Sequence, residues 1–147
     1  MLDLTTFISS FRALAVAAES ELGTNGVVEA EHITMVNWAD MTPPYAVITC
    51  SHFEAADWGA FNLAFEFDCI LWYVLAVTGV SSGLRTKLET LINAIPSGTA
   101  ITGGGEVLGI TRWSYDDELE VNMILRSANR QYRAGMINFR CVIGETP

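Results

Sequence analysis

Apolar residues recur at intervals of three and four near the start of the chain. This spacing predicts an amphipathic helix that begins near Asp3 or Thr5 and stops at Gly23. A second helix is predicted after Ser81 or Ser82, because either hydroxyl can cap the first turn. The apolar positions of this second helix share one side, and they are Leu84, Leu88, Leu91, Ile92 and Ile95. Each predicted helix therefore has one apolar side that can pack on a sheet.

The segment 61–77 alternates with a period of two, which predicts a β-strand. Its odd positions are all apolar or aromatic, whereas its even positions change from polar, as at Glu66 and Asp68, to apolar. The strand is therefore expected to leave solvent and become buried on both faces partway along. At ~3.3 Å per residue the segment would reach about 56 Å, but a compact domain of this size is roughly 38 Å across. We expect it to bend, break or project.

Four further segments have strand character. Residues 28–36 form a weak candidate, and residues 45–50 follow a Pro-Pro break. Residues 119–125 alternate, and after a polar tip a return strand is predicted at about 136–143. The sequence predicts an α+β fold, with a mostly antiparallel sheet of five or six strands and two helices packed on it.

Charge and composition narrow the classes of function. Of 147 residues, 50% are hydrophobic and only 17% are charged, against a usual ~25%, which favours a surface that meets a partner. The net charge of −9 argues against a general nucleic-acid binder or an acidic membrane surface as partner. The apolar, uncharged run at residues 69–84 is too short and too polar to span a bilayer, and the start of the chain does not resemble a signal peptide.

The charges are unevenly distributed. Up to Leu84 there are ten acidic residues and one basic residue, and from Arg85 onward there are seven of each. Four arginines gather on the predicted C-terminal hairpin: Arg126, Arg130, Arg133 and Arg140. They form either a solvated turn or a patch that docks on an acidic neighbouring surface.

Aromatic residues give a second candidate interface. If both helices lie on one side of the sheet, the face that carries Ile70, Trp72 and Val74 has no cover from this chain. A neighbouring subunit is then the natural cover. Trp113 adjoins polar turn residues, as an interface anchor or a core edge would.

Residues with catalytic or ligand-binding potential have simpler interpretations. Cys50, Cys69 and Cys141 are expected to be small buried hydrophobic residues in a reducing compartment. Cys50 and His52 share a predicted strand face, but no second ligand pair stands near them, so we predict no metal. The glycine run at 103–105 precedes a strand instead of a helix, which indicates a flexible turn and not a phosphate loop. No cofactor is predicted.

The order of these elements resembles the tail terminator, or tail-completion, family of long-tailed bacteriophages. The similar features are the N-terminal amphipathic helix, the strand entry Pro43-Pro44-Tyr45-Ala46-Val47-Ile48 and the long apolar strand that runs through Thr78-Gly79 into the helix at 84–92. The terminal strand at 132–142 is similar as well. Residues 1–147 are therefore interpreted as a single tail-terminator-like α+β domain. The insert at 51–59 and the strong acidity depart from the pattern.

The resemblance implies a structural protein of the virion and no enzymatic activity. Such subunits form a homo-hexameric ring at the head-proximal end of the tail tube, in the neck region, after assembly in the host cytoplasm. The implied partners are other copies, the tail tube protein and a head completion or connector protein, while DNA passes through without specific binding. An acidic lining would repel phosphates, and Glu29 and Glu31 are candidate lumen residues. The candidate interface residues are Ile70, Trp72, Val74, Arg126, Arg130 and Arg133.

Other functions stay open at this point. The chain could be another neck or tail-tube component, or a small-molecule-binding domain with a pocket between the aromatic strand and its helices. An enzyme would need a site assembled from distant residues such as His32, His52 and Asp116.

Overall fold

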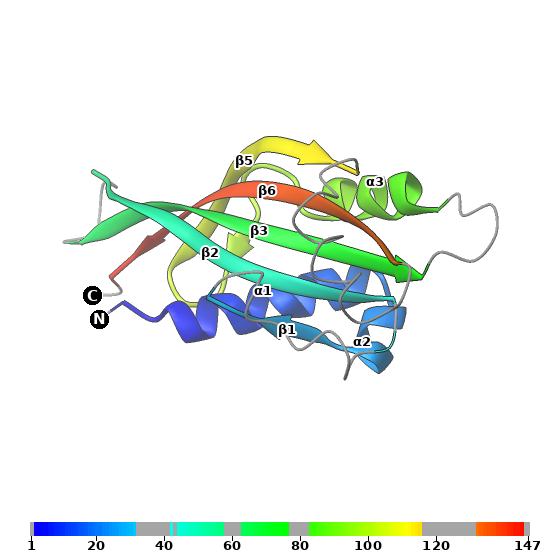
Figure 1. The fold of residues 1–147 in the computed structure, drawn as a ribbon. Coiled ribbons are helices and arrows are strands. Elements are labelled where there is room, and N and C mark those ends of the chain that lie inside the picture. The colour runs from blue at the N-terminus through cyan, green and yellow to red at the C-terminus, as the bar shows by residue number, and fades with distance from the viewer. Residues whose placement is uncertain are drawn as a thin grey trace.

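The long alternating segment forms the centre of a six-stranded, curled sheet in the computed structural model (Figure 1). The structure describes residues 2–31, 42, 44–57, 63–76, 83–115 and 132–145. In the described part the strand order is β1-β2-β3-β6-β5-β4. The strands are β1 (Val27–Glu29), β2 (Tyr45–Ala55), β3 (Ala64–Ala76), β4 (Ala100–Ile101), β5 (Gly105–Ser114) and β6 (Tyr132–Gly144). Only the β1–β2 pair is parallel among them, so the predicted α+β class with a mostly antiparallel sheet is confirmed.

Strand β3 neither breaks nor projects over its described length. It pairs with β6 from Ala64, opposite Gly144, to Ala76, opposite Tyr132. On its other side it pairs with β2. The strand fits into the domain because the whole sheet twists and curves, as Figure 1 shows.

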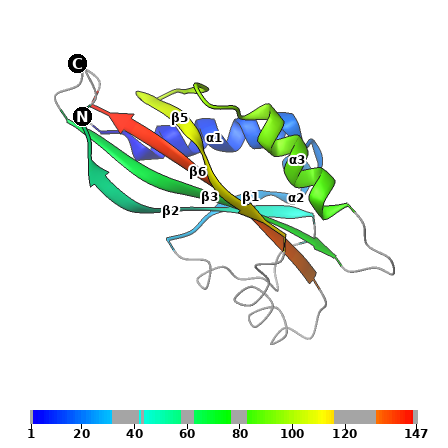
Figure 2. The same ribbon diagram turned by 90° about the horizontal axis from the view of Figure 1, so that it is seen from above.

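The helices are α1 (Leu4–Ala18), α2 (Glu21–Asn25) and α3 (Leu84–Ala94), and α1 and α3 lie on one face of the sheet (Figure 2). Helix α1 begins as predicted, because the Asp3 carboxylate accepts a hydrogen bond from the Thr6 amide at 3.0 Å. The prediction of one helix up to Gly23 is wrong, because Glu19 is extended at the C-cap and α2 follows as a separate turn. The predicted serine cap of α3 is also wrong, because Gly83 occupies the N-cap.

The main core lies between these helices and the sheet. Phe7 and Phe11 of α1 meet Phe67 of β3 and Phe139 of β6 edge to face, with ring centroids 5.1 and 5.2 Å apart. All four rings are fully buried. Edge-to-face pairs of this kind add stability beyond the apolar area that they bury. The odd positions of β3 thus face the helices, as the alternation predicts.

Two glycines let the helices approach the sheet closely. A Cβ at Gly135 of β6 would lie 2.5 Å from Leu88 Cδ1 of α3, and a Cβ at Gly105 of β5 would collide with the Phe7 ring of α1. The glycine run before β5 is a turn, as predicted, with Gly103 and Gly104 at φ 103° and 83°. Only glycine adopts these angles without strain.

Some predicted elements differ in extent or cannot be compared. The predicted strand at 28–36 ends at Glu29 in β1, and its part from residue 32 onward lies outside the described residues. The predicted strand at 119–125 and the polar tip after it also lie outside them. The return strand is present as β6 and is longer than predicted.

Candidate functional site

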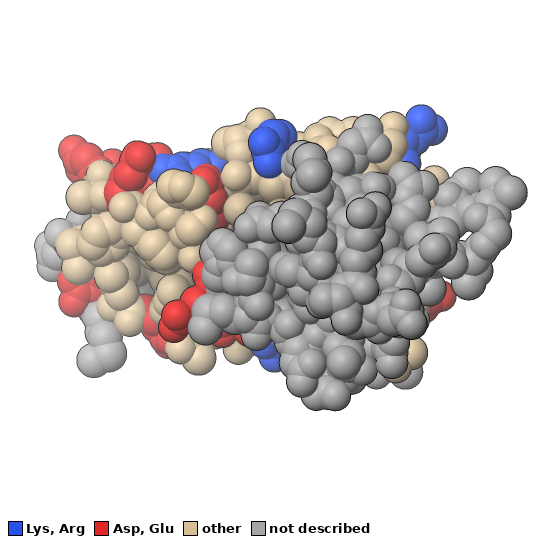
Figure 3. Space-filling model, viewed as in Figure 1, with Lys and Arg blue, Asp and Glu red and all other residues tan. Residues whose placement is uncertain are grey.

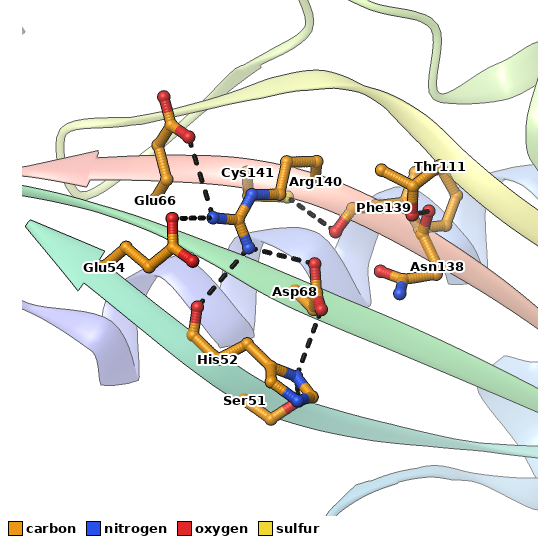
Figure 4. Close-up of polar contacts among 10 residues, drawn as sticks. All are labelled: Ser51, His52, Glu54, Glu66, Asp68, Thr111, Asn138, Phe139, Arg140 and Cys141. Atoms are coloured by element: carbon orange, nitrogen blue, oxygen red, sulfur yellow. Dashed lines mark hydrogen bonds and ion pairs between the residues drawn. The ribbon is translucent and has the colours of Figure 1, made fainter. Parts of the chain in front are cut away.

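The sheet face opposite the helices carries a network of charged residues around Arg140 (Figure 4). The guanidinium Nη1 lies 3.1 Å from Asp68 Oδ1, and Nη2 lies 3.2 Å from Glu54 Oε2 and 3.6 Å from Glu66 Oε2. Nη1 also donates to the carbonyl oxygen of His52 at 3.4 Å. Three strands, β2, β3 and β6, therefore meet at one arginine side chain.

This network holds more negative than positive charge. Asp68 and Arg140 are well shielded, with side chains 17% and 19% exposed, whereas the Glu54 side chain is 73% exposed. The Asp68–Arg140 pair is therefore the strongest interaction in the network, because solvent screens an exposed pair far more. With three carboxylates for one guanidinium, this end of the sheet remains acidic. Figure 3 shows acidic side chains concentrated there.

A β-bulge in β2 brings His52 into the network. The register between β2 and β3 shifts between Ser51 and Glu54, and His52 adopts φ 56°. Its Nδ1 lies 3.1 Å from Asp68 Oδ2. The prediction that Cys50 and His52 share a face is therefore wrong, because Cys50 packs on the helix side. An extra residue in one strand reverses the alternation beyond it.

The same face carries an apolar cluster toward the other end of β3. Its buried members are Tyr45, Val47, Trp72, Val74, Ala134 and Met136. The Trp72 indole N–H donates to Thr49 Oγ1 at 3.4 Å. The predicted change from polar to apolar even positions along β3 is therefore confirmed, with Asp68 in the charged network and Trp72 in the apolar cluster.

The expectation that this apolar face is bare in a single chain is wrong. Both long helices lie on the other face, yet Trp72 is 9% exposed and Val74 is fully buried. Ile70 is partly buried at the edge of the cluster. Tyr45 and Met136 belong to the same buried cluster as Trp72 and Val74. Trp72 and Val74 therefore expose almost no apolar area that a neighbouring subunit would have to cover.

The remaining predicted site residues lie in different places. Glu29 and Glu31 are both exposed, at the end of β1 and just after it. Arg126 and Arg130 lie outside the described residues, as do His32 and Asp116. Arg133 belongs to β6 and pairs with Leu75, but its side chain is not described. The interface assigned to these three arginines therefore stays a prediction.

Three exposed residues at the sheet margins had weak signals in the sequence or none. Phe53 follows the bulge of β2, is 46% exposed and stacks on Phe67 at 4.9 Å. Arg112 and Trp113 are exposed near the end of β5, with Trp113 at 39%. Trp113 was a candidate anchor in the sequence, but Arg112 stood apart from the arginine group and Phe53 lay in the insert at 51–59. Only the folded sheet shows that they are at the surface.

The described residues contain no group of histidine, cysteine, aspartate or glutamate side chains arranged to hold a metal ion. Within the same part of the chain, no helix has the length and apolar character to cross a membrane.

Comparison with models of known protein families finds no match, and comparison with curated proteins finds none either. Among solved structures, the chain is similar to one chain of a structure described as "Virion of native gene transfer agent (GTA) particle". The two share 11% sequence identity with a TM-score of 0.49, and the match covers 95% of this chain and 98% of that one.

Proposed function

We propose that this protein is a structural component of a phage virion that forms a ring at the head-proximal end of the tail tube. There it ends tube growth and joins the tail to the head connector. The resemblance of the sequence to the tail terminator family suggests this function. The structural observation that supports it best is that the two margins of the sheet present unlike surfaces.

One margin is acidic and apolar. Strand β1 pairs only with Ala46–Ile48 of β2, so β2 continues beyond it to Ala55. This free end carries the exposed side chains of Phe53 and Glu54. Behind them lies the charged network, which holds more carboxylates than guanidinium groups.

The other margin carries an exposed arginine beside an exposed tryptophan. Strand β4 pairs with β5 only at Gly105 and Glu106, and further along β5 the side chains of Arg112 and Trp113 are exposed. Arginine and tryptophan are among the residues that contribute most to protein interfaces.

Unlike surfaces on one subunit favour head-to-tail association. In a ring, one face of each subunit must match a different face of the next, and the assembly closes if the rotation between neighbours allows it. The acidic β2 end of one copy and the Arg112 side of the next are complementary in charge. Complementary charges of this kind fix the register of association and exclude wrong pairings.

Charge exchange across this contact tests the proposal. Arg112→Glu alone and Glu54→Arg alone should each reduce assembly, and the double variant should restore it, because the pair is then reversed but again complementary. Light scattering on the purified chain should show a species near six times the 16.1 kDa chain. If the purified chain stays monomeric, its assembly is measured after tail tubes are added. Arg85→Glu is the control, since it makes the same change of charge at an exposed arginine that lies on helix α3 and not on the sheet. Full assembly in both single variants would contradict the proposed contact.

Electron microscopy tests the role in the virion. Without the protein, tubes of uncontrolled length that do not join heads are expected. A labelled copy should lie only at the head-proximal end. Label along the whole tube would show that the protein is a tube component and not a terminator.

A further inference from the structure

Three free thiols lie on three neighbouring strands, on the face covered by the helices. They are Cys50 of β2, Cys69 of β3 and Cys141 of β6. Cys69 and Cys141 are fully buried, whereas Cys50 is half-buried. The proposed ring does not use this cluster.

The register distinguishes among the three possible pairs. Cys50 lies directly opposite Cys69, but Cys141 lies opposite Phe67 and is therefore only a diagonal neighbour of Cys69. Directly opposed residues of antiparallel strands have Cα atoms about 4.5–5.5 Å apart, inside the usual range for a disulfide of about 4.4–6.8 Å. Diagonal neighbours are about 7–8 Å apart, which is beyond it.

The surroundings of Cys69 favour its protonated form. Hydrogen bonds with Cys141 and then Cys50, followed by burial, raise the pKa of the Cys69 thiol well above its ordinary value. Cys69 is therefore a protonated, shielded thiol, and Cys50 is the member of the pair that solvent reaches.

We propose that Cys50 and Cys69 are a site of reversible oxidation that peroxide converts into a disulfide between β2 and β3. Hydrogen peroxide oxidises the Cys50 thiol to a sulfenic acid and is itself reduced to water. The Cys69 sulfur then attacks the Cys50 sulfur, the S–O bond breaks, and the hydroxyl leaves as a second water with the Cys69 proton. The protein loses two hydrogens in total, and Cys141 keeps its thiol.

This bond would join two strands that are already paired, just before the bulge at His52. It closes the stretch of chain between positions 50 and 69 in the unfolded state, which reduces the conformational freedom of that state. The oxidised protein should therefore unfold at a higher temperature than the reduced protein. A reductant such as dithiothreitol should reverse the shift.

Mass spectrometry on the folded chain tests the proposal. After limited peroxide treatment, alkylation in denaturant should label one cysteine instead of three. Digestion after glutamate cuts between the pair at Glu54 and Glu66, so a linked peptide containing Cys50 and Cys69 should appear and disappear on reduction. Three alkylated thiols, a link that includes Cys141, or Cys50 oxidised to a sulfinic acid would each overturn the proposal.

Variants provide the matched comparison. Cys141→Ser should still form the link, and Cys50→Ser should lose it and keep two thiols open to alkylation. If Cys141→Ser fails to fold, the peptide map of the unaltered protein decides by itself, because it identifies both linked residues directly. A link retained in Cys50→Ser would contradict the assignment.

Discussion

Asp68 and Arg140 lie directly opposite each other on β3 and β6, and their side chains meet at 3.1 Å on the face away from the helices. Both side chains are largely but not completely buried, because each exposes less than a fifth of its surface to solvent. A partly buried ion pair contributes more to the stability of the fold than an exposed pair, and salt weakens it less.

Replacing Arg140 should therefore destabilise the fold. Arg140→Met leaves Asp68 shielded without its guanidinium partner, and we expect a loss of about 1–3 kcal/mol in the free energy of unfolding, between the values for exposed and buried pairs. Urea denaturation measures it. Combining Arg140→Met with Asp68→Leu should recover part of the loss, because no shielded charge remains at that pair. A loss below about 0.5 kcal/mol would show that the pair is energetically equivalent to a surface pair.

The close approach of α3 to β6 leads to a second prediction. Gly135→Ala places a methyl group 2.5 Å from Leu88 Cδ1, so the helix or the side chain must shift. We expect a cost of about 1–3 kcal/mol, typical of overpacking in a core. Gly109→Ala is the matched control in the neighbouring strand, since its Cβ would meet nothing within 4 Å.

In the background of Leu88→Ala the cost of Gly135→Ala should fall, because the clashing methyl groups are gone. A double-mutant cycle measured by thermal unfolding tests this. Strictly additive losses would mean that the clash is not with Leu88.

The N-cap of α1 makes stability depend on pH. The hydrogen bonds with Thr6, side-chain first and then backbone, lower the pKa of the Asp3 carboxyl below its usual 3.8. Because the folded pKa is the lower one, the carboxylate contribution is present above pH about 3.8 and is lost as the pH falls through the folded value. The difference in Tm between the wild type and Asp3→Ala should therefore be largest at neutral pH and shrink in acid.

Asp3→Asn provides the control for this pH dependence. Its amide oxygen can accept from the Thr6 amide at any pH. Its Tm difference from Asp3→Ala should stay nearly constant from neutral pH to about pH 2.5. A constant difference for the wild type as well would contradict the role of the carboxylate.

The candidate lumen residues can be tested within the proposed ring. Glu29→Lys with Glu31→Lys reverses two exposed charges, and a positive lining should retain DNA and slow its ejection. Infectivity and the rate of ejection are the measurements, and raising the salt concentration should reduce the effect. Glu21→Lys on α2 is a control with an exposed acid on the helix side. Unchanged infectivity and ejection in the double variant would remove these residues from the lumen.

Periodic patterns in the sequence predicted the central features of the fold. The alternation around Phe67 identified the central strand, and the change at even positions between Asp68 and Trp72 identified its two environments. Both predictions rest on burial, because the buried face of a strand requires apolar residues at every second position and so produces a regular pattern in the sequence.

Local irregularities were not predictable in this way. One extra residue at His52 reverses the faces of β2, and no periodic pattern marks it. The partners of Arg140 come from strands distant in sequence, so spacing gives no sign of them. The burial of Trp72 was not predictable from the spacing either, because it depends on how the whole chain folds.

The position of β3 between β2 and β6 has a consequence for synthesis of the protein. Residues 64–76 leave the ribosome well before residues 132–144, which form one of their two hydrogen-bonding neighbours. During that interval a long, apolar strand has an open edge, and such edges readily add strands from other chains. The nascent protein is therefore most vulnerable to aggregation between these two points of translation, and slower elongation there should lower the yield of folded protein.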